Sequence, residues 1–205
     1  MFKQIKLQTL FIASILLAVS CTKDDPEEIH EHEINKVILH FTNTADNSSF
    51  KVKWELEHDG EEHTDDDEHA HESHIELAPN STYSVEAEFY QTNEEEDSHD
   101  HDGDHEEEGE DITPEIIDEN DVHYIFYEFV GLNNLSITSA DDDVIDTNGF
   151  GINLNTTWTT TAKEIGDIKL YLIHEPQTKE GSVRNDFGGE DDTVAGFEVH
   201  IELED

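Results

Sequence analysis

Hydrophobic and polar residues alternate along most of the chain after residue 33. The clearest example is residues 50–56 (FKVKWEL), in which every second residue from Phe50 to Leu56 is apolar and the residues between them are charged. A period of two is typical of a β-strand with one buried face. The pattern predicts about eight short strands, at residues 34–41, 50–56, 83–90, 122–130, 135–138, 152–160, 168–174 and 197–203.

Segments rich in Gly, Pro, Asn and Ser separate these strands and are typical turn sequences. They include residues 47–49 (NSS), 79–81 (PNS), 131–134 (GLNN) and 188–189 (GG). The chain offers one helix candidate, residues 113–117, where Thr113 would cap the helix and Pro114 would take its first position. Strands joined by turns, with no helical crossover, predict an all-β fold, namely an antiparallel Ig-like β-sandwich.

Two long segments interrupt this pattern and consist mainly of acidic residues and histidine. They are residues 57–76 (EHDGEEHTDDDEHAHESHIE) and residues 94–111 (EEEDSHDHDGDHEEEGED). Neither has an apolar face to bury, so both are expected to be long loops on the sandwich. The first would connect a strand that ends near Leu56 to one that starts near Ile75, and the second would follow Tyr90.

The first twenty residues differ from the rest of the chain. Two lysines precede an apolar run, residues 10–19, which leads into Cys21. This is the pattern of a secretory signal peptide, here residues 1–20, and the run is too short to span a bilayer as a helix. Cys21 is the only cysteine and sits where a bacterial lipoprotein signal places the lipidated residue, although Ala18 replaces the usual leucine three residues earlier.

We therefore expect lipidation of Cys21 and anchoring in the outer membrane of a Gram-negative envelope. The alternative is an ordinary signal peptide followed by an unpaired thiol. An acidic tether, residues 21–29, follows and is similar to the surface-export signal of Bacteroidota lipoproteins, although it also fits a plain flexible linker. These features predict a surface-exposed lipoprotein whose folded domain spans residues 30–205.

Acidic residues dominate the composition. The chain has 53 Asp and Glu residues against 10 Lys and Arg residues, which gives a formal net charge of −43 with histidine neutral. This charge argues against nucleic-acid binding, which requires a basic surface. It also disfavours adsorption to anionic lipids, so a lipid anchor would have to hold the protein at the membrane. Bound cations would relieve the self-repulsion, and we expect sensitivity to divalent ions.

Fourteen histidines accompany this charge, and eight of them lie in the two acidic loops. Imidazole and carboxylate together suit zinc, copper or nickel, and alternate residues of an extended segment, such as His69 and His71, point the same way. The predicted loop ligands are His58, His63, His69, His71, His74, His99, His101 and His105. The alternative is a solvated loop whose histidines only titrate.

A second set of histidines lies at the ends of predicted strands. His30 and His32 precede the first strand, His123 begins a later strand, and His174 ends another. If these ends meet, they would form a preformed metal site; otherwise they are histidines at sheet ends, hydrogen-bonded to their neighbours. The remaining two alternate with apolar residues and are expected to be structural: His40 and His200.

Two aspartate-rich segments fit calcium, which prefers oxygen ligands. Residues 100–104 (DHDGD) partly resemble a calcium loop but lack the spacing and the helices of an EF-hand, and residues 141–149 (DDDVIDTNG) form the other segment. Calcium is therefore less favoured than zinc. The sequence contains no G-x-S-x-G, HExxH, P-loop or dinucleotide motif, so we do not expect an enzyme.

Several longer phrases occur in a characteristic order. They are HEHEINKVIL (30–39), ELAPNSTYSVEAEF (76–89), DITPEIIDENDVHYIFYEF (111–129), GDIKLYLIHEP (166–176) and GGEDDTVAGFEVHIEL (188–203). Together they resemble a family of uncharacterised Bacteroidota outer-membrane lipoproteins. The resemblance implies an outer-membrane β-domain and no particular activity, and the two His-rich loops look like additions to its core.

These observations favour a lipid-anchored lipoprotein that binds zinc, or copper or nickel. It would pass the ion to a TonB-dependent receptor or sequester an excess. The alternative is a protein of another class, an Ig-like adhesion or assembly module whose acidic loops only keep it hydrated.

Overall fold

The computed structural model describes residues 34–56, 73–91 and 109–203, all within one compact unit, residues 31–205. The described residues form ten strands and two short helices. These are β1 (Lys36–Asn43), β2 (Ser49–Glu55), β3 (Ser73–Leu77), β4 (Thr82–Gln91), β5 (Glu110–Asp111), α1 (Thr113–Asp118), β6 (His123–Val130), β7 (Leu135–Ser139), β8 (Asn155–Thr160), β9 (Glu164–His174), α2 (Arg184–Phe187) and β10 (Glu190–Ile201).

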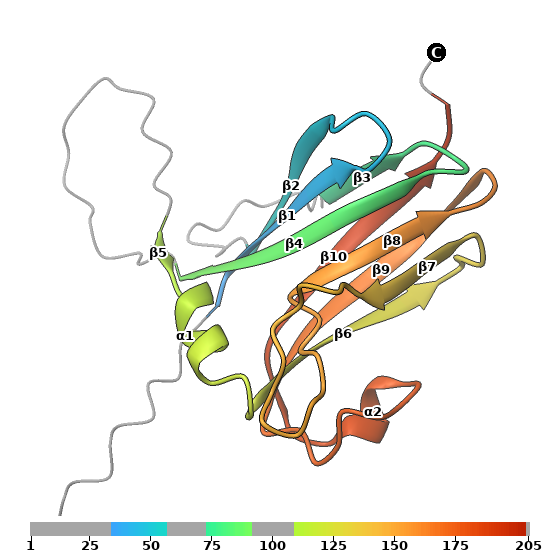
Figure 1. Cartoon of the computed structure of the whole chain (residues 1–205). Helices are drawn as coiled ribbons and strands as arrows, with labels where there is room; N and C mark the ends of the chain where they lie inside the picture. Colours follow the sequence, from blue (N-terminus) through green and yellow to red (C-terminus); the bar gives the residue numbers. More distant parts are fainter. Residues whose placement is uncertain (1–33, 57–72, 92–108, 204–205) are drawn as a thin grey trace, which may run out of the picture. The chain divides into compact units, whose positions relative to one another are not determined.

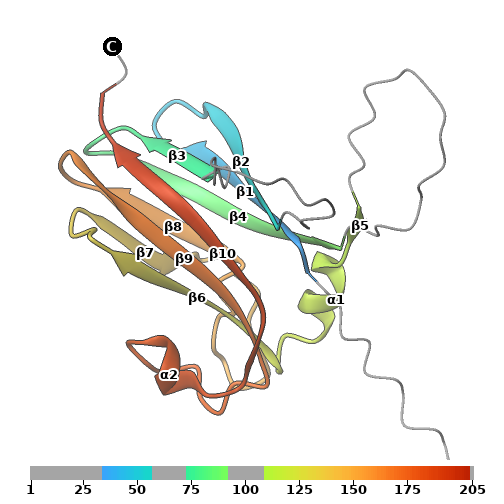
Figure 2. The ribbon, with the colours of Figure 1, turned by 180° about the vertical axis from the view of Figure 1, so that it is seen from behind.

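The strands form two sheets that share one hydrophobic core (Figure 1). The first has the order β2-β1-β4-β8-β7, with β5 paired to the end of β4. The second has the order β3-β10-β9-β6, and its strands lie side by side in the reverse view (Figure 2). The predicted all-β sandwich is confirmed, because the strands are mostly antiparallel and lie in two sheets.

The period-two pattern explains the core. In β4, the residues from Tyr83 to Phe89 on one face are almost fully buried, while Ser84 and Glu86 between them are exposed. Trp158 of β8 is fully buried, and its indole N–H donates a hydrogen bond of 2.9 Å to the hydroxyl of Thr156. Burial of each such apolar side chain contributes roughly 1.5–3 kcal/mol, and the satisfied indole avoids the cost of an unpaired donor.

One pair of strands departs from the antiparallel prediction. β3 and β10 run parallel, with Glu198 beside His74 and Val199 beside Ile75. Parallel neighbours need a long connection, and most of the described chain lies between these two strands. β3 also begins at Ser73, inside the segment 57–76 that the sequence predicts to be a loop.

The helix prediction is right in place but wrong in its cap. α1 begins at Thr113 with Ile112 as the N-cap residue and no side-chain cap. The hydroxyl of Thr113 instead accepts a hydrogen bond of 2.9 Å from the backbone N–H of Phe89, and the carboxylate of Asp111 accepts one of 3.0 Å from the backbone N–H of Thr113. The side chain of Thr113 therefore connects the helix to β4.

Candidate metal centre

Two of the predicted strand-end histidines lie together. His123 begins β6 and His174 ends β9, and the antiparallel register places them directly opposite each other. Their ring centroids are 5.0 Å apart, and Nδ1 of His174 lies 3.2 Å from Nε2 of His123. His123 is 6% exposed, whereas His174 is one-third exposed. One ring is therefore fixed in the protein and the other faces solvent.

Asp192 completes the group and was not predicted. Its Oδ2 lies 3.5 Å from Nε2 of His123 and 3.6 Å from Nδ1 of His174. The register between β9 and β10 shifts between Asp191 and Thr193, so Asp192 is the extra residue of a β-bulge. A bulge redirects a side chain that regular pairing would point elsewhere, and here it turns one carboxylate of an acidic run toward the two rings.

The three ligand atoms have the spacing that a small tetrahedral ion requires. Zinc bound to nitrogen and oxygen at about 2.0–2.1 Å in a tetrahedral site separates its ligand atoms by about 3.4 Å. The three separations among His123, His174 and Asp192 run from 3.2 to 3.6 Å. Three protein ligands of this kind leave a fourth position for water or an incoming group.

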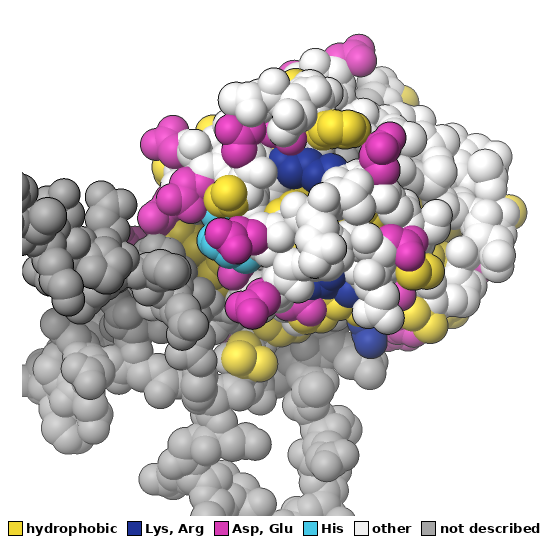
Figure 3. Space-filling model, turned by 90° about the horizontal axis from the view of Figure 1, so that it is seen from below, with side chains coloured by type: hydrophobic (Ala, Val, Ile, Leu, Met, Phe, Trp, Pro, Cys, Tyr) yellow, Lys and Arg dark blue, Asp and Glu magenta, His cyan; other side chains and the backbone are white. Residues whose placement is uncertain are grey.

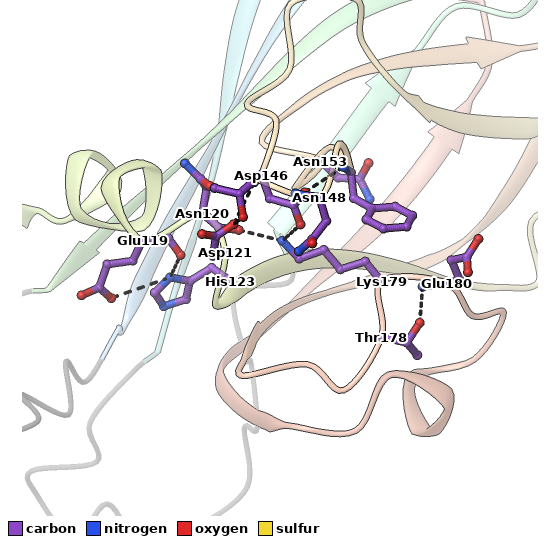
Figure 4. A network of polar contacts seen from close by, with 12 residues as sticks. Glu119, Asn120, Asp121, His123, Asp146, Asn148, Asn153, Thr178, Lys179 and Glu180 are labelled. Carbon is purple, nitrogen blue, oxygen red and sulfur yellow. Dashed lines mark hydrogen bonds and ion pairs between the residues drawn. The ribbon is translucent and has the colours of Figure 1, made fainter.

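A backbone carbonyl orients the buried ring. Nδ1 of His123 lies 3.2 Å from the carbonyl oxygen of Glu119, in the turn that follows α1 (Figure 4). A carbonyl only accepts hydrogen bonds, so Nδ1 carries the proton in this contact and the lone pair of Nε2 points at the group. Such an outer partner fixes the tautomer and the ring plane of a metal-binding histidine.

The same atoms also fit a hydrogen bond in which Nδ1–H of His174 donates to Nε2 of His123. The geometry is thus that of a site that can hold a metal ion, and the described residues contain one other group of this kind. It consists of His74 on β3 and of Glu198 and His200 on β10. The sequence predicts a loop position for His74 and a structural role for His200, but the parallel pairing brings them together.

The other predicted residues fall into two classes. His40 lies on β1, and its Nε2 is 2.7 Å from the carboxylate of Glu88, as expected for a structural histidine. The rest lie outside the described residues, together with the aspartate-rich segment 100–104: Cys21, His30, His32, His58, His63, His69, His71, His99, His101 and His105.

The two buried carboxylates of segment 141–149, those of Asp143 and Asp146, already have partners inside the protein. Asp143 accepts hydrogen bonds from the hydroxyl of Ser139 at 2.5 Å and from the backbone N–H groups of Asn153 at 2.8 Å and Asn155 at 2.9 Å. It is almost fully buried. These contacts make Asp143 a structural link between the turn and β8, so we do not place calcium there.

Asp146 has a cation of the protein as its partner. Its Oδ2 lies 2.8 Å from Nζ of Lys179, and the two side chains are only 1% and 6% exposed. Burial alone would raise the pKa of Asp146, but the hydrogen bond and charge of Lys179 and the backbone N–H groups of Phe150 and Asn148 outweigh it and hold the pKa below its usual value.

The turn after α1 connects this ion pair to the candidate metal centre. Nζ of Lys179 also donates a hydrogen bond of 2.6 Å to the carbonyl oxygen of Asn120, next to the Glu119 carbonyl that contacts His123 (Figure 4). The carboxylate of Asp121 accepts hydrogen bonds from the backbone N–H and the hydroxyl of Thr147, which lower its pKa. The carbonyl that orients His123 therefore belongs to a fixed segment.

Acidic side chains are scattered over the face seen from below, with a histidine among them (Figure 3).

Among the described residues, neither helix has the length and apolar character needed to span a bilayer. No family model matches the chain, and no curated protein or solved structure matches it either.

Proposed function

We propose that this protein is a lipid-anchored lipoprotein of the outer membrane that binds a divalent transition-metal ion, zinc first, at His123, His174 and Asp192. The observation that carries the proposal is the spacing of three ligand atoms, 3.2–3.6 Å, from three different strands. Two imidazoles favour zinc, copper or nickel over calcium, which prefers oxygen.

The environment supports reversible binding. The carbonyl of Glu119 holds His123 before any ion arrives, which reduces the ordering cost of binding. His174 and Asp192 are partly exposed, so an ion can enter and leave from one side. A site with three ligands and one open position suits the transfer of an ion to a receptor, such as a TonB-dependent one, or the sequestration of an excess.

The location rests on the sequence. The apolar run before Cys21 and the acidic residues after it support lipidation and surface export. The histidines in the two acidic segments would add weaker sites that collect ions near the ordered centre. Binding would also offset part of the charge of −43. We propose no enzymatic step.

The test isolates the ordered histidines from the others. A chain that begins at Thr22 contains the whole compact unit. We would replace the nine histidines outside the described residues by asparagine: His30, His32, His58, His63, His69, His71, His99, His101 and His105. The five-histidine chain that results keeps His40, His74, His123, His174 and His200.

Zinc titration calorimetry on this five-histidine chain should show a tight step that is lost in His174→Asn. The matched control is His40→Asn, which alters a half-buried histidine outside both groups and should keep the step. The loss should be at least about tenfold in affinity, because even an outer partner of a ligand is worth 10–100-fold. Equal isotherms for parent and His174→Asn, or no binding below millimolar zinc, would refute the site.

One observation favours the alternative of a binding module that needs no metal. A groove of about 520 Å³ lies beside β6 and β7, and Phe129 and Val183 on its wall are exposed. Apolar residues on a groove at the open side of a sandwich are typical of an interaction surface. If this is the main function, partner binding would be unchanged in EDTA and in His174→Asn, but weakened by Phe129→Ser.

A further inference from the structure

A second group of ligating side chains lies on the outer face of the second sheet, where β3 pairs with β10. His74, Glu198 and His200 alternate with residues that are buried in the core, such as Ile75 and Val199. The side chains of the three residues are 21–35% exposed. They belong to neither the candidate centre at the strand ends nor the Asp146 ion pair.

Glu198 contacts both rings through its carboxylate. Its Oε2 lies 3.3 Å from Nδ1 of His74, the residue beside it in the parallel register, and its Oε1 lies 3.0 Å from Nε2 of His200. The two ring centroids are 3.9 Å apart, and one ligand atom from each residue lies within 4.8 Å of the others. Two imidazoles and a carboxylate on one face are a ligand set for a borderline divalent ion.

β3 is a strand that such an ion would stabilise. It has five residues, forms the edge of its sheet, and is held in that sheet by β10 alone. Beyond this pairing, the carbonyl of Leu77 accepts a hydrogen bond of 2.9 Å from the backbone N–H of Glu202, directly after β10. The hydroxyl of Ser73 donates one of 2.7 Å to the carbonyl of Lys53 on β2. β3 and β10 are far apart in the sequence, so local contacts contribute little to the stability of this short parallel pair.

We propose that His74, Glu198 and His200 form a second, weaker site for a divalent transition-metal ion, and that occupancy of this site clamps β3 onto β10. It is weaker because Glu198 contacts the two rings through different oxygens, Oε2 and Oε1, so the side chains must rearrange before they can share one small ion. It gains from a further carboxylate, since Oε1 of Glu202 lies 3.9 Å from Nδ1 of His200. This site shares no residue with the strand-end centre, so either site can be absent without the other.

Hydrogen–deuterium exchange of β3, read by mass spectrometry with and without zinc, tests the clamp in the five-histidine chain. Zinc should slow exchange of the amides of residues 73–77 by about tenfold or more, the factor that corresponds to about 1.4 kcal/mol. His200→Gln should abolish this slowing, and His40→Gln, the matched control, should retain it. Exchange of β9 without zinc should be equal in all three chains, which shows that they fold alike.

His174→Asn separates the two proposals, because it breaks the strand-end centre and should leave the zinc-dependent protection of β3 intact. If zinc does not slow β3 exchange in the five-histidine chain, or slows it equally in His200→Gln, the second site is refuted. If protection of β3 disappears in His174→Asn, the effect comes from the strand-end centre and the second site is again refuted.

Discussion

Two polar clusters contact the turn at residues 119–121, one through Lys179 and the other through His123 (Figure 4). They compensate negative charge in different ways. In one, the carboxylate of Asp146 meets Lys179, a cation of the protein itself. In the other, the carboxylate of Asp192 meets the ring nitrogens of His123 and His174. A carboxylate whose charge is compensated by a lysine and backbone N–H groups needs no bound ion, whereas a carboxylate that lies close to two imidazole nitrogens could hold one. In a chain with so many carboxylates, a candidate metal site is therefore identified by which carboxylates lack a cationic partner from the protein, and not by the number of acidic residues.

Removal of the internal cation should have the largest effect. Lys179→Met leaves Asp146 buried without its partner, so we expect a loss of about 3–5 kcal/mol in the free energy of unfolding. Urea denaturation without zinc measures this loss. Lys163→Met, which removes an exposed lysine, is the matched control and should change stability by less than about 0.5 kcal/mol.

The double variant Lys179→Met with Asp146→Asn sharpens the interpretation. It removes both charges, while the side-chain amide introduced at position 146 keeps an oxygen that can accept the hydrogen bonds from the backbone N–H groups of Asn148 and Phe150. Most of the stability should return, because the penalty of Lys179→Met comes mainly from an unpaired buried charge. A double variant as unstable as Lys179→Met would show that packing of the lysine chain is the main contribution.

The opposite result is expected at the strand ends. Asp192→Asn removes one ligand and should weaken zinc binding of the five-histidine chain by about tenfold or more. Its unfolding free energy without zinc should change by less than about 1 kcal/mol, since the side chain is partly exposed. The matched control is Glu190→Gln, which neutralises a residue of the same acidic run outside the centre. If Glu190→Gln lowers zinc affinity as much as Asp192→Asn does, Asp192 is not a specific ligand.

The two clusters should lose their function at different pH values. The pKa of Asp146 in the folded protein lies below its ordinary value of 3.8. The ionised side chain therefore contributes its full stabilisation above pH 3.8, and this stabilisation is lost as the pH falls toward the lower pKa of the folded state. The stability advantage of the parent over Asp146→Asn, measured by urea denaturation from pH 7 to pH 3, should therefore persist to about pH 4. Zinc binding needs neutral imidazoles and should weaken already in mildly acidic solution. An advantage lost at the same pH as zinc binding would contradict this separation.

The smallest effect is expected from the side chain of Glu119. Its carboxylate lies 3.9 Å from Nδ1 of His123 and is half exposed, whereas its backbone carbonyl makes the closer contact at 3.2 Å. Glu119→Gln keeps the carbonyl and should change zinc affinity by less than about threefold, because exposed ion pairs contribute little. A larger change in calorimetry would mean that the carboxylate, and not the carbonyl, positions the ring.

The sequence predicted the parts of this structure that repeat with a regular period. The buried face of β4 follows from simple alternation, and the places of His123 and His174 at strand ends follow from the limits of two alternating segments. Their direct pairing did not follow, because alternation does not state which strands are neighbours. β9 and β10 also begin earlier than predicted, since the mixed polar and apolar residues at their starts still pair through the backbone.

The unpredicted parts depend on irregular backbone or on distant partners. Asp192 is one of three consecutive acidic residues, and only the bulge selects it. Lys179 lies in a polar stretch that resembles an exposed loop, yet it is buried against Asp146 from a different segment. The group of His74 and His200 depends on a parallel pair that a chain of turns and hairpins gives no reason to expect.

The position of β10 has a consequence for the order of folding. It lies in the middle of the second sheet, and β3 has no other partner there, although β3 ends at Leu77 and β10 begins at Glu190. Such long-range closure makes assembly slow, and an early segment cannot settle while the late one is still being synthesised. The second sheet would therefore be completed last, because β3 and β9 lack their shared neighbour until residues 190–201 have left the ribosome.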